Sequence, residues 1–236
     1  MSLRSPALAI GVIDNVSRLA FHRAEMKKLL ASGALVFLSA LPGAYAAAEQ
    51  PVPTSMTQET ESNFSRGARE FQNVTGAFFF FDTTQNNRPA IDFAINSTRF
   101  GIMLNDPWQW GPLSGNAEVL GELFGGGIFD GPGDVMTGAT LIFRYNFVQP
   151  QSRIIPYLQI GAGGVYTNIG ERESRGLISL PVEFNLQGIG GTRIMLSDRW
   201  SLVIEGGYRH ISNAEIKKPN FGIDSVGGNL GFGFFF

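Results

Sequence analysis

The last strand-like segment of the chain carries its apolar side chains at every second position. One face of this segment is formed by Leu230, Phe232, Phe234 and the final residue, Phe236. A strand this aromatic at the edge of a soluble sheet would promote aggregation in water. Lipid along one face and closure of the sheet remove that hazard, because hydrocarbon accepts the aromatic side chains and a closed sheet has no free edge. The pattern therefore favours a β-barrel in a membrane over an edge strand of a soluble sandwich.

The chain after about residue 65 has the same strand-and-turn character throughout. No segment has convincing helical periodicity, and none contains 18 consecutive apolar residues. Turn-forming residues, for example around Asn86 and Gly131, separate the strand-like stretches. Eight such stretches can be placed, at roughly 66–81, 88–104, 114–129, 135–148, 152–167, 180–196, 200–212 and 223–236. We therefore predict one all-β domain over residues 65–236, an eight-stranded antiparallel transmembrane β-barrel of the outer membrane.

Alternation within the strands indicates which side chains face lipid. Leu141, Phe143 and Tyr145 alternate with Thr140 and Arg144, so an apolar face opposes a polar one. In a membrane barrel the apolar face lies outside and the polar face lines the lumen. Side chains fill the interior of a barrel with eight strands, so we do not expect a porin.

The stretch 88–104 departs from this regular pattern. Its apolar positions change parity between Phe93 and Phe100. A β-bulge near Asn96–Thr98 would restore the alternation. The alternative is that the boundary of this strand is misplaced.

The N-terminal region resembles an export signal. Lys27 and Lys28 precede an apolar run, and Ala44-Tyr45-Ala46 is a small-x-small cleavage site, so residues 26–46 are predicted to be a secretory signal peptide. A transmembrane helix is the alternative, but the apolar run is too short to cross a bilayer. Residues 1–25 are then an over-extended start or a long n-region, and the polar residues 47–64 a flexible leader. An exported barrel is expected in the outer membrane.

Composition excludes several kinds of chemistry. The chain has no cysteine, which rules out disulfides, thiolate zinc sites and a cysteine nucleophile. The net charge of −2 gives no indication of nucleic-acid binding. Of the two histidines, His22 lies before the predicted cleavage site, so histidine chemistry in the mature chain must use His210.

Three polar residues are predicted to meet on the lipid-facing side at the outer leaflet. His210 and Ser212 share one face of the stretch 200–212, and Asp224 has the parity of Phe236 on the next strand. With an even number of strands both termini are periplasmic, which places these residues near the outer boundary of the hydrocarbon. Polar groups there are functional candidates. The alternative is an interfacial girdle of polar side chains.

The residue types of this group fit a serine hydrolase. Ser212 would attack an ester carbonyl, His210 would take and return the proton, and Asp224 would orient the imidazole. The backbone N–H of Asn213, with Asn220 or Gly222 nearby, could form an oxyanion hole.

Charged residues elsewhere suggest further contacts. Lys217 and Lys218 could bind lipid phosphates, although a solvated loop pair explains them equally well. Glu118 and Glu122 are expected to pair with lumenal arginines rather than bind a metal. Neither a metal nor a cofactor is expected.

The segment from Arg209 to Asp224 resembles the active-site segment of the lipid A 3-O-deacylase (PagL) family. The family's His-x-Ser falls on His210 and Ser212, and its asparagines fall on Asn213 and Asn220. Its catalytic carboxylate, usually glutamate, falls on Asp224. Aspartate is one methylene shorter, which puts its reach to the imidazole in question.

The resemblance implies an eight-stranded outer-membrane esterase. Such an enzyme hydrolyses the ester-linked 3-hydroxyacyl chain at position 3 of lipid A, with water as the second substrate. Its partners would be lipopolysaccharide and membrane lipids, and it would be a monomer or homodimer. Two alternatives are a non-catalytic small barrel that binds lipopolysaccharide or has a structural role, and the same chemistry on another lipid ester.

Overall fold

The computed structural model describes residues 62–81, 88–170 and 173–236. The predicted over-extended start, the predicted signal peptide and almost all of the predicted leader lie outside these residues. No helix in the described ranges is both long and apolar enough to cross a membrane.

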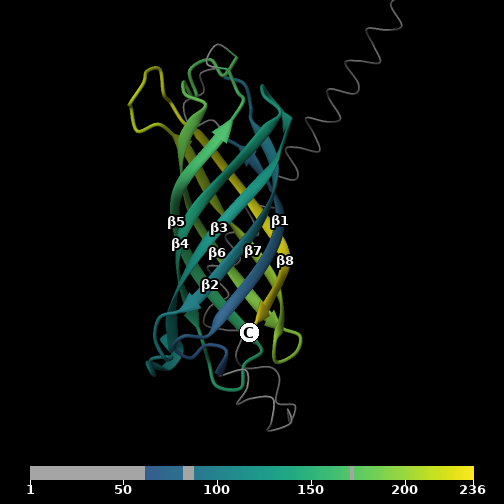
Figure 1. Cartoon of the computed structure of the whole chain (residues 1–236), viewed down its shortest axis with the longest axis vertical. Helices are drawn as coiled ribbons and strands as arrows, with labels where there is room; N and C mark the ends of the chain where they lie inside the picture. The colour runs from purple at the N-terminus through teal and green to yellow at the C-terminus, as the bar shows by residue number, and fades with distance from the viewer. Residues whose placement is uncertain (1–61, 82–87, 171–172) are drawn as a thin grey trace, which may run out of the picture.

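The described chain forms one closed antiparallel β-barrel (Figure 1). Each strand pairs with its sequence neighbours, and β1 pairs with β8 to close the sheet. The eight strands are β1 Arg69–Phe80, β2 Asp92–Met103, β3 Gly115–Asp130, β4 Val135–Phe147, β5 Ile154–Thr167, β6 Val182–Met195, β7 Trp200–Ser212 and β8 Ile223–Phe235, with a short 3₁₀ helix, η2 Gly111–Leu113, between β2 and β3. The predicted fold class and strand number are confirmed, and the bounds agree closely.

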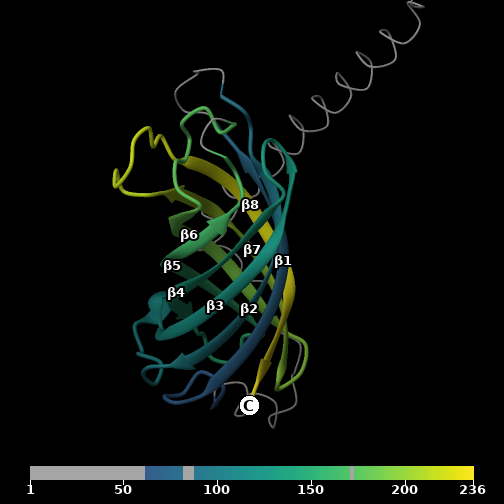
Figure 2. The same cartoon turned by 45° about the horizontal axis from the view of Figure 1, so that its top comes forward.

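The two ends of the barrel differ in their connections. The end that holds the C-terminus also holds the β2–β3, β4–β5 and β6–β7 connections, and we call it the proximal end. The opposite, distal end holds the connections of the other four strand pairs. Figure 2 shows the β5–β6 and β7–β8 connections, in green and yellow, side by side at this distal end.

The predicted parity break in the stretch 88–104 has a different cause from a bulge near Asn96–Thr98. The β2–β3 ladder is regular from Phe93 to Met103, and its one irregularity lies between Asp92 and Phe93. Phe93 is fully buried inside the barrel, whereas Phe100 is exposed on the outside. Phe93 points inward because the lumen is apolar at the distal end of the barrel. Its inward position changes the parity of the apolar residues without any shift in the strand register.

A network of buried ion pairs crosses the middle of the lumen. Arg193 Nη2 lies 2.7 Å from Glu118 Oε2, and Arg99 Nη1 lies 2.7 Å from Glu205 Oε1. The fully buried members of this network are Arg99, Arg144, Arg193, Arg209, Glu70, Glu118, Glu122 and Glu205. Buried charges require such partners, since an unpaired one is strongly destabilising. The network fills the lumen as predicted for a barrel of this size.

Two charged residues of β7 that both point into the lumen do not pair with each other. Glu205 contacts Arg99, and Arg209 contacts Glu122. Side chains that point into a narrow barrel reach across it, and neighbours on the same strand do not necessarily meet.

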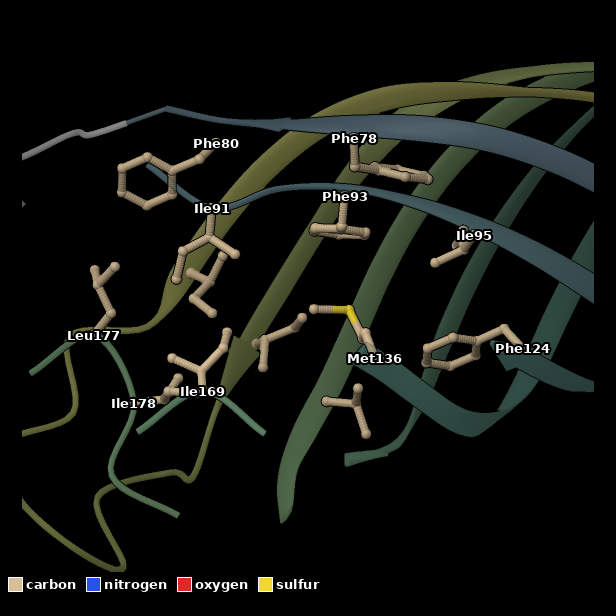
Figure 3. Close-up of a cluster of buried hydrophobic side chains, with 13 residues drawn as sticks. Phe78, Phe80, Ile91, Phe93, Ile95, Phe124, Met136, Ile169, Leu177 and Ile178 are labelled. Carbon is tan, nitrogen blue, oxygen red and sulfur yellow. The ribbon is translucent and has the colours of Figure 1, made fainter. Parts of the chain in front are cut away.

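Apolar clusters close the lumen at both ends. The distal cluster contains Phe78, Phe93 and Met136, and Figure 3 shows the rings of Phe78 and Phe93 stacked. The proximal cluster includes Phe64, whose ring lies 5.4 Å from that of Phe235. Phe64, the last residue of the predicted leader, therefore belongs to the packed interior of the barrel.

Candidate active site

Strands β7 and β8 bring three polar side chains into one hydrogen-bonded chain. His210 and Asp224 are direct partners in the β7–β8 ladder. His210 Nδ1 lies 2.7 Å from Asp224 Oδ1, and His210 Nε2 lies 2.8 Å from Ser212 Oγ. The shorter carboxylate therefore reaches the imidazole with the strands in regular register. The order of the three groups and their hydrogen bonds match the arrangement found in serine hydrolases.

This triad of residues lies on the outer surface of the barrel at its distal end. The side chains of His210 and Asp224 are 27% and 20% exposed. Their sequence neighbours Ile211 and Ile223 point inward and belong to the distal apolar cluster. Alternation along two paired strands thus anchors the polar groups outside by packing their neighbours inside.

Gly222 forms the surface against which the imidazole packs. Its φ of +82° favours glycine, and a Cβ built there would lie 2.6 Å from His210 Cε1. A side chain at this position would displace the ring. Only glycine combines this backbone conformation with so close an approach.

Asn213 and Asn220 organise the connection that follows Ser212. The Asn213 N–H donates to Asn220 Oδ1 at 3.2 Å, and the Asn213 side chain donates to the Lys217 carbonyl at 3.0 Å. The Gly222 N–H donates to the Leu177 carbonyl at 2.8 Å. The Asn213 N–H expected for an oxyanion hole is therefore engaged within the loops, and so is the N–H of Gly222.

Comparison with known proteins identifies the group to which this barrel belongs. The model of the lipid A 3-O-deacylase (PagL) family matches residues 93–233, a range that contains all three members of the triad. The chain belongs to the PagL family. The resemblance inferred from Arg209 to Asp224 is thereby confirmed across most of the barrel.

Several solved outer-membrane proteins are similar in structure to this PagL family member. The outer membrane enzyme PagL is 20% identical, with 69% of this chain and 98% of that chain covered and a TM-score of 0.47. Neisserial surface protein A is 14% identical, with 72% and 98% covered and a TM-score of 0.46. The N-terminal β-barrel domain of Pseudomonas aeruginosa OprF is 16% identical, with the same coverages and TM-score. No curated protein matches the chain in sequence.

The two lysines of the β7–β8 connection have different surroundings. Lys217 Nζ donates to the Ser179 carbonyl at 3.2 Å. Lys218 Nζ lies 3.2 Å from Glu215 Oε2, and both of these side chains are more than 70% exposed. The Lys218 ammonium is thus exposed at the surface, while Lys217 contacts the neighbouring β5–β6 connection.

No pattern in the sequence indicated that the β5–β6 connection supports the site. Ser179 accepts a hydrogen bond from the Asn213 side chain at 3.1 Å and donates one to the Lys217 carbonyl at 2.8 Å. The stretch 168–181 lacks periodicity, and its contacts depend on how two loops meet. The hydrogen bond from the Tyr208 hydroxyl to Asp224 was likewise not predicted from the sequence.

The residues of the site offer no arrangement for a metal ion. Within the described ranges, no group of three or more His, Cys, Asp or Glu side chains is placed to hold one.

Proposed function

We propose that the chain is an outer-membrane esterase that releases the 3-hydroxyacyl chain ester-linked at position 3 of lipid A. The observation that carries this proposal is the hydrogen-bonded chain from Ser212 through His210 to Asp224 in a member of the deacylase family. The reaction needs water as the second substrate and uses no cofactor.

The first half of the reaction transfers the acyl group to the protein. Ser212 Oγ attacks the ester carbonyl while His210 Nε2 accepts its proton. The tetrahedral intermediate collapses as the bond to the sugar oxygen breaks, and the imidazolium returns the proton to that oxygen. Asp224 holds the ring through Nδ1 and stabilises its charged form. Water, activated by the same imidazole, then attacks the acyl-serine and frees the hydroxy fatty acid.

The Asn220 side chain is our candidate for the group that stabilises the oxyanion. Its Oδ1 accepts from the N–H of Asn213, the residue after Ser212, and this bond holds the amide beside the nucleophile. The amide NH₂ is then the end that can donate to the developing negative charge. Asn220 was one of the candidates named from the sequence, and in this proposal it takes the place of the Asn213 N–H, which its own side chain engages.

The outer surface of the barrel fits the location of the substrate. Large apolar side chains such as Phe100, Leu123 and Ile160 are 59%, 67% and 68% exposed there. A hydrocarbon environment accounts for them, and an even strand number puts the proximal end in the periplasm. The triad then lies in the outer leaflet, where lipid A reaches it by lateral diffusion. Export through the predicted signal peptide 26–46 and contact of Lys218 with a lipid A phosphate belong to the same proposal.

Mass spectrometry of lipid A from Gram-negative cells that express the chain tests the activity. The wild type should remove one hydroxyacyl mass, and Ser212→Ala should not. Ser201→Ala is the matched control, because Ser201 lies on the same strand but at its proximal end and points inward. Unchanged lipid A with a folded wild-type barrel would exclude the proposal and favour a non-catalytic barrel. Release of fatty acid from phospholipid instead would identify a different ester as the substrate.

A further inference from the structure

Tyr208 contacts the acid of the triad directly. It lies on β7 two residues before His210 and on the same outward face. Its hydroxyl donates a hydrogen bond to Asp224 Oδ1, the oxygen that also lies 2.7 Å from His210 Nδ1. The same carboxylate oxygen therefore contacts both Tyr208 and His210 on the adjacent strand.

The ring of Tyr208 is held in place on two sides. Its centroid lies 6.5 Å from that of His210, with the two planes 20° apart, and 6.1 Å from that of Phe81. The Phe81 N–H also donates to the Asp224 carbonyl at 3.0 Å, which ties the end of β1 to the same residue. The phenol is thus presented to the carboxylate by packing as well as by its hydrogen bond.

A carboxylate on this outward face needs a second donor. Asp224 is 20% exposed, and the exposed apolar side chains of Phe184 and Leu186 lie on β6 opposite Ser212 and His210. A charged oxygen in such surroundings is destabilised unless hydrogen bonds compensate for lost water. A bond from a phenol to a carboxylate is of the stronger, charge-assisted kind. It also adds a second restraint on rotation of the carboxylate about its last bond, because both Tyr208 and His210 hold Oδ1.

We propose that Tyr208 is a positioning residue for the hydrolysis, and that it acts through Asp224 by fixing the carboxylate toward His210 Nδ1. This inference rests on the proposed esterase function. An ordinary interfacial tyrosine would need only its amphipathic ring at the membrane boundary. Tyr208 differs because its hydroxyl is committed to a group that itself contacts the base.

Replacement of the hydroxyl alone tests the inference. Tyr208→Phe and the wild-type full chain would be assayed in detergent micelles with lipid A, after heat-dependent gel migration shows that each barrel is folded. Tyr208→Phe is expected to lower kcat about tenfold and to leave KM within about twofold, because Tyr208 orients the acid and does not bind the lipid. Tyr145→Phe is the matched control. Its hydroxyl donates to the Leu113 carbonyl at 2.7 Å at the proximal end, so it loses a comparable bond and should keep full kcat.

A double-mutant cycle shows whether Tyr208 acts through Asp224. In the Asp224→Asn background, measured at high enzyme concentration, Tyr208→Phe should change kcat by less than about twofold, since the group that it positions has been removed. An equal loss in both backgrounds would overturn the inference and indicate a general structural effect.

Two failures can be told apart in this experiment. A folded wild type that releases no hydroxy fatty acid would remove the proposed function, and the positioning role with it. An active wild type with an equally active Tyr208→Phe variant would overturn the positioning role alone.

Discussion

His210 and Asp224 stand directly opposite each other in the β7–β8 ladder, with 2.7 Å between Nδ1 and Oδ1. Directly opposed side chains in an antiparallel pair have their Cβ atoms about 5 Å apart. That spacing lets an aspartate meet the imidazole without any shift of either strand. The methylene that distinguishes Asp224 from the usual glutamate of the family is therefore not needed here.

Substitutions of Asp224 should reflect this fit. Asp224→Asn should lower the rate of deacylation by on the order of 10³–10⁴-fold, because the amide favours the wrong tautomer of the imidazole. Asp224→Glu should not exceed the wild type, since the extra methylene has no gap to fill. Release of hydroxy fatty acid by purified, folded variants measures both effects. A faster Asp224→Glu enzyme would show that the aspartate orients His210 less well than a glutamate does.

Addition of a methyl group at Gly222 should affect the chemistry more than the fold. The new Cβ would lie 2.6 Å from His210 Cε1 and push the ring away from Ser212, so we expect a fall in rate of more than about tenfold. Gly67→Ala is the control, because Gly67 has a similar φ of +86° and its Cβ would meet nothing within 4 Å. Both variants should lose about 1–2 kcal/mol in urea unfolding from the backbone strain. Equal rates in the two would contradict the contact with His210.

Asn220 should influence kcat rather than substrate binding. Loss of an oxyanion donor typically lowers kcat by about 10²–10³-fold, and Asn220→Ala should fall in this range with little change in KM. Asn168→Ala serves as the comparison. Asn168 lies at the same end of the barrel, where its Oδ1 accepts from the N–H of Asp134 at 2.8 Å. Steady-state kinetics that show both variants equally impaired would assign Asn220 to loop structure alone.

The lumenal network should govern stability and leave the site intact. Arg193→Met leaves Glu118 and Glu70 short of a partner in the fully buried lumen, and we expect a loss of about 3–5 kcal/mol in the free energy of unfolding. Lys218→Met removes an exposed pair that contributes little to stability. Urea titration followed by gel migration compares the two. Any Arg193→Met protein that folds should keep the wild-type rate, and an inactive folded barrel would contradict the separation of network and site.

The strands and the orientation of their side chains were predictable because the local alternation of residues determines them. The period of two along each strand separates the outward set, which includes His210 and Ser212, from the inward set. Since β7 and β8 are consecutive strands, a short connection forces them to pair, and the parity of Phe236 then orients Asp224. Neither inference needs any knowledge of distant parts of the chain.

The sequence by itself therefore determined the closed β fold, the strand number and the face on which each triad residue lies. The tertiary structure alone decided that His210 stands opposite Asp224, and that Glu205 pairs with Arg99, which is 106 residues away. It also decided that the N–H of Asn213 is already bonded to Asn220 and that Tyr208 reaches Asp224. These contacts depend on strand stagger, barrel closure and the meeting of two loops. All three depend on packing over the whole barrel, so they cannot be predicted from the periodicity of residues along the chain.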